Sequence, residues 1–276
     1  HKNAKLRNAI AGELDCMCGI VGYIGDRPAQ SILVSGLEKL EYRGYDSAGV
    51  ATIVEGNLDC IRAKGKLHNL REKIEVATNR APIGIGHTRW ATHGKPEEYN
   101  AHPHTDTKRR LAVVQNGIIE NYRELREELK KQGHEFRSQT DTEVIPHLIS
   151  QCFADGADTL MVAVQQAVHK LSGAFAIAVI SADYPDELIL ARQQAPLVIG
   201  IGEGEYFCAS DTPAIVQYTR TILPLENGEM ARLTREGVEV CTFDGAKVRC
   251  TPHSITWNPI AVEKQGFRHF MAKEIY

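Results

Sequence analysis

The residues whose types could do chemistry begin with Cys18, which lies in the run Met17–Gly22. If the chain before Cys18 is removed, this one residue carries both a thiol and a free α-amino group. The amine can then accept the thiol proton, directly or through a water, because an α-amine titrates at about 7.7–8.0 and a free thiol near about 8.5. The alternative is a strand that starts with a small buried cysteine. Other segments must decide between the two.

The segment His87–Gly94 contains an arginine, a tryptophan, two threonines and two histidines. The planar guanidinium of Arg89 can donate two parallel hydrogen bonds to a carboxylate. Thr92 and His93 can add hydrogen bonds, and Trp90 can exclude water. The alternative is an Arg–Trp stack on the protein surface.

The dipeptide Asn116-Gly117 follows the apolar stretch that begins at Val113. Asn-Gly after a strand is typical of a hairpin turn. It can equally form an oxyanion hole from the Asn116 side-chain amide and the Gly117 N–H, donors that stabilise negative charge in acyl transfer.

Asp141 lies between two threonines, ahead of an apolar helical pattern. It can cap that helix, or it can pair with a ligand ammonium. An arginine for a carboxylate and an aspartate for an ammonium together describe a pocket for a free amino acid.

Two histidines, His102 and His104, flank a proline, and His87 and His93 are near in sequence. Histidines one residue apart can ligate a metal, but no acidic or cysteine partner stands at a helpful spacing, and the proline favours a fixed loop. We expect no metal and no cofactor.

The composition is that of an ordinary globular protein, with 276 residues, 43% hydrophobic and 24% charged residues and a net charge of −3. This charge gives no indication of nucleic-acid binding, and no apolar run approaches the roughly 20 residues of a membrane span. The seven cysteines are odd in number and scattered, which argues against a disulfide framework and fits a reducing cytoplasm.

The elements that must position these residues are strands and helices in alternation, followed by a series of strands. Apolar residues at helical spacing, proline or glycine punctuation and a helix-start pattern predict helices over Pro28–Leu40, Asn121–Gln132, from Thr140 onward, and Thr159–Leu171. Apolar runs bounded by turn residues predict strands over Cys18–Ile24, Val50–Val54, Ile83–His87, Leu111–Gln115, Ala174–Ile180, Leu188–Arg192, Leu197–Ile201, Tyr206–Ala209, Glu229–Leu233 and Val238–Phe243. Short turns imply antiparallel pairing, with helices on the outer faces of two packed sheets.

Taken together, six separated motifs resemble the glutaminase domain of the glucosamine-6-phosphate synthase family, the isomerising glutamine:fructose-6-phosphate aminotransferases. They occur in the expected order and are Met17–Gly22, Leu40–Gly49, His87–Gly94, Asn100–His104, Asn116–Asn121 and Thr140–Val144. The segment Leu40–Gly49 and the tail Arg268–Tyr276 favour this family over other amidotransferases that share the nucleophile.

The resemblance implies an N-terminal-nucleophile hydrolase fold, an α+β, four-layer αββα sandwich of two antiparallel sheets. It implies that Cys18 is the nucleophile and that Asn116 with the Gly117 N–H forms the oxyanion hole. Arg89 would hold the α-carboxylate of glutamine and Asp141 its α-ammonium. In the same way, Thr92 and His93 would line the pocket, Trp90 would lie on a loop that closes over glutamine, and His102 would lie near the site in a role that the motif does not fix.

The implied function is hydrolysis of L-glutamine to glutamate and ammonia through a cysteinyl thioester. Residues 1–16 would be an N-terminal extension (a tag, a propeptide or an upstream start), 17–256 the glutaminase domain, and 257–276 the start of a linker to a sugar-phosphate isomerase domain. Fructose-6-phosphate would be a substrate only of the full-length enzyme, which the resemblance makes a cytoplasmic homodimer without nucleic-acid or membrane partners. The alternatives are an N-terminal-nucleophile hydrolase with another amide substrate and a non-catalytic amino-acid-sensing domain.

Overall fold

The computed structural model describes residues 18–256, which form two antiparallel β-sheets. The first sheet has eight strands, in the spatial order β14 (His253–Ser254), β11 (Thr221–Pro224), β9 (Val198–Ile201), β10 (Tyr206–Ala209), β1 (Gly19–Ile24), β4 (Ile83–Arg89), β2 (Ser47–Val54) and β3 (Asn57–Lys64). The second has six strands, in the order β13 (Val238–Thr242), β12 (Glu229–Leu233), β8 (Tyr184–Gln193), β7 (Gly173–Ser181), β6 (Leu111–Ile119) and β5 (His104–Thr105).

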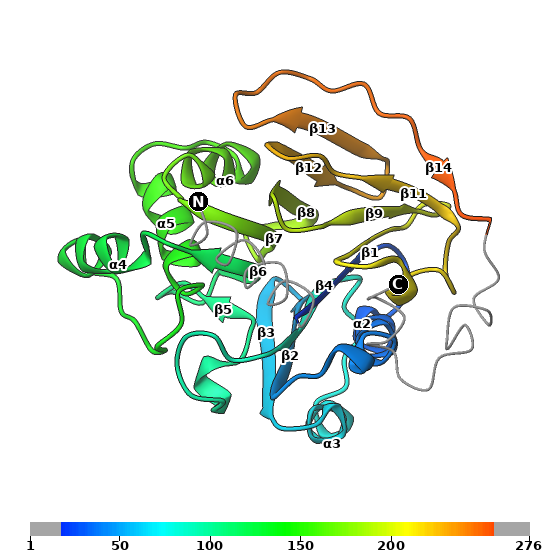
Figure 1. Ribbon diagram of the computed structural model, residues 1–276, viewed down its shortest axis with the longest axis horizontal. Coiled ribbons are helices and arrows are strands. Elements are labelled where there is room, and N and C mark those ends of the chain that lie inside the picture. The colour runs from blue at the N-terminus through cyan, green and yellow to red at the C-terminus, as the bar shows by residue number, and fades with distance from the viewer. Residues whose placement is uncertain (1–17, 257–276) are drawn as a thin grey trace, which may run out of the picture.

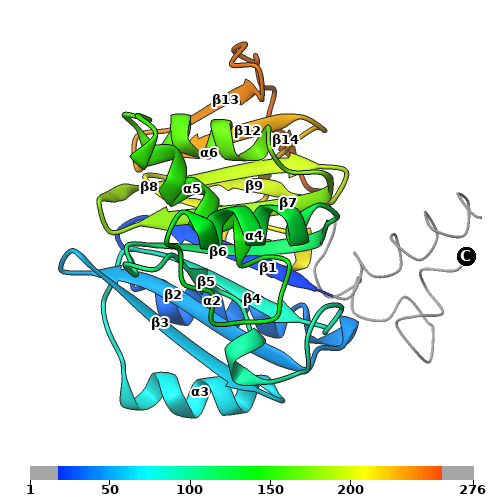
Figure 2. The same ribbon diagram turned by 90° about the vertical axis from the view of Figure 1, so that its left-hand side faces the viewer.

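Helices cover the outer face of each sheet (Figures 1 and 2). Helices α2 (Ala29–Glu38) and α3 (Leu67–Val76) lie against the first sheet, and α4 (Tyr122–Lys131), α5 (Val144–Ala154) and α6 (Leu160–Val168) lie on the side of the second. Short 3-10 turns occur at Glu41–Arg43, Glu98–Asn100 and Thr212–Ala214. The layer order is therefore helices, sheet, sheet, helices, which confirms the expected αββα sandwich.

The strand β1 is apolar along its whole length because it packs against a core on each face. Successive side chains of a strand point to opposite faces. Ile20 and Ile24 enter the core between the two sheets, whereas Val21 and Tyr23 enter the core beneath α2. Because both faces of β1 are buried, its sequence shows no polar alternation.

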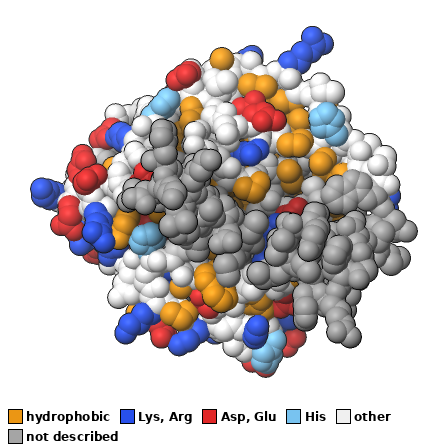
Figure 3. Space-filling model, in the orientation of Figure 1, with side chains coloured by type: hydrophobic (Ala, Val, Ile, Leu, Met, Phe, Trp, Pro, Cys, Tyr) orange, Lys and Arg blue, Asp and Glu red, His pale blue; other side chains and the backbone are white. Residues whose placement is uncertain are grey.

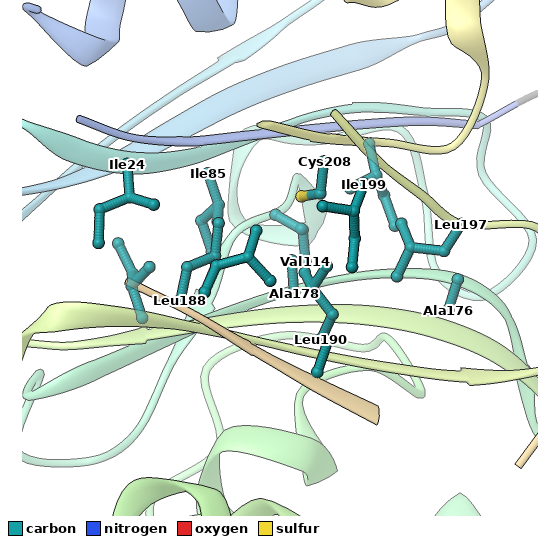
Figure 4. Close-up of a cluster of buried hydrophobic side chains, with 14 of the residues drawn as sticks. Ile24, Ile85, Val114, Ala176, Ala178, Leu188, Leu190, Leu197, Ile199 and Cys208 are labelled. Atoms are coloured by element: carbon teal, nitrogen blue, oxygen red, sulfur yellow. The ribbon is translucent and has the colours of Figure 1, made fainter. Parts of the chain in front are cut away.

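A core of apolar side chains fills the layer between the two sheets. Ile85 of β4 and Val114 of β6 point into this layer from opposite sheets, together with Leu188, Leu190 and Cys208 (Figure 4). On the face in Figure 3, acidic and basic side chains are mixed around the charged helix α4. None of the described helices is long and apolar enough to cross a membrane.

Most predicted elements are present, with corrections at particular places. The predicted bounds of β10 and β12 agree with the structure. Pro28 precedes α2 as its N-cap instead of lying in the first turn. The strands β3 and β11 and the helix α3 were not predicted. The strand predicted over Leu111–Gln115 continues to Ile119.

Candidate active site

Cys18 comes directly before β1, at the end of the first sheet where β4 finishes. In the antiparallel register Gly19 pairs with Thr88, so Cys18 lies beside the chain that leaves β4. The residue is 9% exposed. Its Sγ lies 3.3 Å from the backbone nitrogen of Trp90, which can donate a hydrogen bond to it. This N–H favours the thiolate, because a hydrogen bond to the charged form of a group stabilises that form.

Asn116 reaches Cys18 from the opposite sheet. Its Nδ2 donates to the Cys18 carbonyl oxygen at 3.2 Å, and its Oδ1 lies 2.9 Å from Nε2 of His87. The hairpin-turn interpretation of Asn116-Gly117 is wrong, because β6 pairs with β7 without interruption from Leu111 to Ile119. The side-chain amide of Asn116 therefore lies next to the residue predicted to be the nucleophile.

Gly117 occupies a backbone conformation that requires glycine. Its φ is 94°, in the left-handed region, and a Cβ at this position would collide with the carbonyl oxygen of Ala174. A side chain would thus meet two separate penalties, one in the dihedral angles and one in the neighbouring strand.

We expect Gly117→Ala to lower the free energy of unfolding by about 3 kcal/mol or more, and the melting temperature by about 5–10 °C. Gly133→Ala is the matched control, because Gly133 has the same φ of 94° and no atom near its missing Cβ. Its cost should stay near 1–2 kcal/mol. Equal losses in thermal unfolding would contradict a role for the Ala174 collision.

Arg89 is the last residue of β4 and is 3% exposed, which excludes a surface stack with Trp90. Its Nη2 donates to the His93 carbonyl and its Nη1 to that of Lys95 at 3.5 Å. Burial lowers the pKa of Arg89, while the charges of Asp46, Cys18 and Asp141 raise it. A guanidinium has five N–H donors, so these two contacts leave others for a ligand.

The loop after β4 is held at its base by Asp46. The Asp46 carboxylate accepts a hydrogen bond from the Ala91 nitrogen at 2.6 Å, and the Asp46 nitrogen donates to the Arg89 carbonyl at 2.8 Å. Trp90 is 40% exposed between these anchors. Thr92 is exposed and has its hydroxyl 3.4 Å from Nδ1 of His93.

Asp141 is buried, and its carboxylate bonds to a residue outside α5. One oxygen accepts a hydrogen bond from the Ile119 nitrogen at 2.8 Å, and the other lies 3.7 Å from Nδ1 of His93. Helix α5 begins after Glu143, without a side-chain cap, so the capping interpretation of Asp141 is wrong. Burial raises the pKa of Asp141, although the Ile119 N–H and the nearby His93 and Arg89 oppose this.

His102 lies against His87 and the backbone of Gln115. Its ring stacks on that of His87 with the centroids 4.1 Å apart, and its Nδ1 accepts a hydrogen bond from the Gln115 nitrogen at 3.4 Å. Burial lowers the pKa of His102, and it lowers the pKa values of His87 and His104 to about 3. No group of three or more His, Cys, Asp or Glu in residues 18–256 is arranged to hold a metal ion.

The predicted residues converge at one end of the two sheets. Cys18 contacts Asn116 and Trp90, Arg89 contacts His93, and His93 lies beside Asp141. Trp90 and Thr92 are the members that the structure places at the surface. Sequence reasoning missed the contributions of His87, as the partner of Asn116, and of Asp46. The alternation of side chains along β4 could have placed His87 on the same face as Ile83 and Ile85, which is the face toward the second sheet.

Comparisons with known proteins point to the family that the sequence motifs resemble. A family model described as "Glutamine amidotransferase domain" matches residues 87–217. A glutamine–fructose-6-phosphate aminotransferase (isomerizing) of Thermosynechococcus vestitus is 70% identical over 262 residues, which is 94% of this chain and 42% of that protein. Enzymes of the same name from Aquifex aeolicus and Thermococcus kodakarensis are 54% and 50% identical, with 94% of this chain and 43% of each protein covered.

Over residues 87–217 the chain thus matches the glutamine amidotransferase domain model, and over 94% of its length it is similar to the aminotransferases named above. Among solved structures, it is similar to the glutamine phosphoribosylpyrophosphate amidotransferase of B. subtilis, with a TM-score of 0.71 and 29% identity over 84% of this chain and 50% of that one. The chain is also similar to a structure described as the allosteric regulatory enzyme of purine biosynthesis. The TM-score is 0.72 and the sequence identity 30%, over 82% of this chain and 49% of that one. The domain spans less than half the length of the curated relatives it matches.

Proposed function

We propose that this domain hydrolyses L-glutamine to glutamate and ammonia, with Cys18 as the nucleophile. The observation that carries the proposal is the contact of Asn116 with Cys18: a side-chain amide from one sheet lies against the thiol-bearing residue of the other. A thiol beside a fixed N–H donor is the arrangement that acyl transfer requires. The similarity to enzymes whose names include glutamine supports the choice of substrate.

The α-carboxylate and α-ammonium of glutamine would be recognised by opposite charges. Arg89 would donate to the carboxylate through the N–H groups that its backbone contacts leave, and Asp141 would pair with the ammonium. His93 would line this pocket, because it bridges the two charged residues. Thr92 and Trp90 lie on the loop after β4, which would close over the bound substrate and exclude water.

The thiolate of Cys18 would attack the side-chain amide carbon of glutamine, so that an S–C bond forms. The thiol proton passes to the α-amine of Cys18 and from there to the leaving nitrogen. The C–N bond breaks, ammonia leaves and a γ-glutamyl thioester remains. Asn116 and the Gly117 N–H would stabilise the oxyanion. Water then hydrolyses the thioester to glutamate and restores the thiol, without a cofactor.

The longer protein implied by the relatives would use the ammonia to aminate fructose-6-phosphate. In this proposal residues 17–256 form the glutaminase domain, residues 1–16 are an extension that must be removed together with Met17 to expose the Cys18 amine, and residues 257–276 lead to an isomerase domain. Residues 1–17 and 257–276 lie outside the described part of the chain. We propose further that the full-length enzyme works in the cytoplasm as a homodimer.

The proposal is tested by assaying the chain with its first residue determined by mass spectrometry. Protein that begins at Cys18 should release glutamate and ammonia in equal amounts from glutamine, and the uncleaved chain should be nearly inactive, because a peptide bond removes the basic amine. Hydrolysis of another amide with no hydrolysis of glutamine would favour a different substrate. Glutamine binding without a thioester would favour an amino-acid sensor.

A further inference from the structure

We infer that His87 is a positioning residue, which holds the side-chain amide of Asn116 in the orientation that offers its NH₂ group to the oxyanion. This inference rests on the proposed function, because it assigns His87 a task in that same site. Three observations carry it: the neighbours of the Asn116 amide, the position of His87 in its strand, and the ring stacked on His87.

The neighbours of the Asn116 amide determine which way round it lies. A backbone carbonyl can only accept hydrogen bonds, so the end of the amide that faces the Cys18 carbonyl at 3.2 Å must be the NH₂ group. The amide oxygen then faces Nε2 of His87 at 2.9 Å. Since that oxygen can only accept, His87 must carry its proton on Nε2. The Cys18 carbonyl thereby determines the tautomer of His87, through the amide of Asn116 that lies between them.

The position of His87 shows that packing alone does not require a histidine. Ile83, Ile85 and His87 alternate along β4 on the face toward the second sheet, and Ala112, Val114 and Asn116 alternate along β6 on the facing side. Figure 4 shows Ile85 and Val114 pointing into the layer between the sheets. An apolar residue at position 87 would continue the pattern of Ile83 and Ile85. A buried polar side chain costs stability unless it is hydrogen-bonded. The bond to Asn116 meets that cost.

The ring of His102 stacks on His87, and burial favours the neutral form of His87. The two centroids are 4.1 Å apart with an interplanar angle of 19°. The ring of His104 lies 5.0 Å from that of His102, and its Nε2 is 2.9 Å from the Thr140 hydroxyl. Burial lowers the pKa of His87 to about 3, and the nearby positive charge of Arg89 lowers it as well. A neutral ring keeps one proton, which the bond to Asn116 places on Nε2.

The kinetic test compares two substitutions of His87 in protein that begins at Cys18. His87→Leu removes the donor and should lower kcat for glutamine by about 10- to 100-fold, with KM changed by less than about threefold, since an oxyanion donor is worth about 10²–10³. His87→Gln retains an N–H near the position of Nε2 and should recover most of kcat. Ile85→Val, on the same row, is the control for disturbed packing and should leave both constants unchanged.

Two further measurements separate this inference from the proposed function. Alkylation of Cys18 by iodoacetamide needs no oxyanion hole and should proceed at the same rate in the His87→Leu variant. Nitrogen-15 NMR of the wild-type imidazole should report the neutral Nε2–H tautomer of His87, whether or not glutamine is hydrolysed. If the wild type fails to hydrolyse glutamine, the proposed function is wrong. A wild-type kcat in the Leu variant, no recovery in the Gln variant, or an Nδ1–H tautomer would overturn the role of His87.

Discussion

Replacement of Cys18 by alanine is expected to reduce glutamine hydrolysis by at least about 10⁴-fold, because the thiolate is the group that forms the thioester. The fold should remain. The Trp90 nitrogen donates a hydrogen bond to the thiol, and a bond of this kind contributes about 1 kcal/mol. Ammonia release measures the loss of glutamine hydrolysis, and thermal unfolding of the same preparations measures whether the fold remains stable.

Cys208 offers a matched control for the loss of a buried thiol. It lies on β10, fully buried between the two sheets and remote from the Asn116 contact. Cys208→Ala should lower the stability by about 1–2 kcal/mol because it leaves a small cavity, and it should retain the wild-type kcat. Residual glutaminase activity in the Cys18→Ala variant within tenfold of the wild type would contradict the assignment of the nucleophile.

The site could be predicted from the sequence where residue types carry the chemistry, and not where the fold supplies it. Cys18, Arg89 and Asp141 are charged or reactive residues, so their types alone pointed to chemistry. The contact between Asn116 and His87 joins two strands of different sheets and depends on their facing positions. No local pattern contains that information, and His87 was therefore considered only as one of several histidines near a possible metal site.

The dipeptide Asn116-Gly117 illustrates how tertiary contacts override local preference. Asn-Gly favours a two-residue hairpin, but here β6 continues through it for two further residues, paired with β7. Asn116 is held by bonds to Cys18 and His87, and Gly117 takes a left-handed φ within the pairing. The oxyanion hole proposed for Asn116 and Gly117 would account for a turn sequence inside a strand.

The unpredicted strand β3 was missed for a different reason. It lies at the edge of the first sheet, and most of its residues are half-buried. Leu58 and Cys60 pack against the core between the sheets, whereas Ile61 packs against the core beneath the helices. Because apolar and charged residues occur on both faces, the alternation that identifies a one-sided strand is lost.

Asp141→Asn is expected to stabilise the protein and to weaken glutamine binding at the same time. The wild-type carboxylate is buried, with an N–H donor at 2.8 Å and His93 at 3.7 Å. Burial of the charge raises its pKa, which means that the ionised form costs stability in the folded protein. Asparagine keeps an oxygen that accepts from Ile119 and carries no charge. We expect the melting temperature to rise by a few degrees at pH 7.

The same substitution should raise KM for glutamine by about 100-fold, since it removes the partner of the substrate ammonium, and a buried charge pair broken on one side costs about 2–5 kcal/mol. Glutamate release over a range of glutamine concentrations measures this loss.

The stability gained by the Asn variant should depend on pH in a defined direction. Above the folded pKa of Asp141 the wild type bears the full cost of its buried charge. As the pH falls through that pKa toward the ordinary value of an aspartate, the folded carboxyl takes up a proton and the cost disappears. The advantage of the Asn variant in thermal unfolding should therefore be present at pH 7 and lost in acid. An Asn variant that is less stable than the wild type at pH 7, or that binds glutamine equally well, would show that Asp141 is a structural residue and that the ammonium of the substrate is recognised elsewhere.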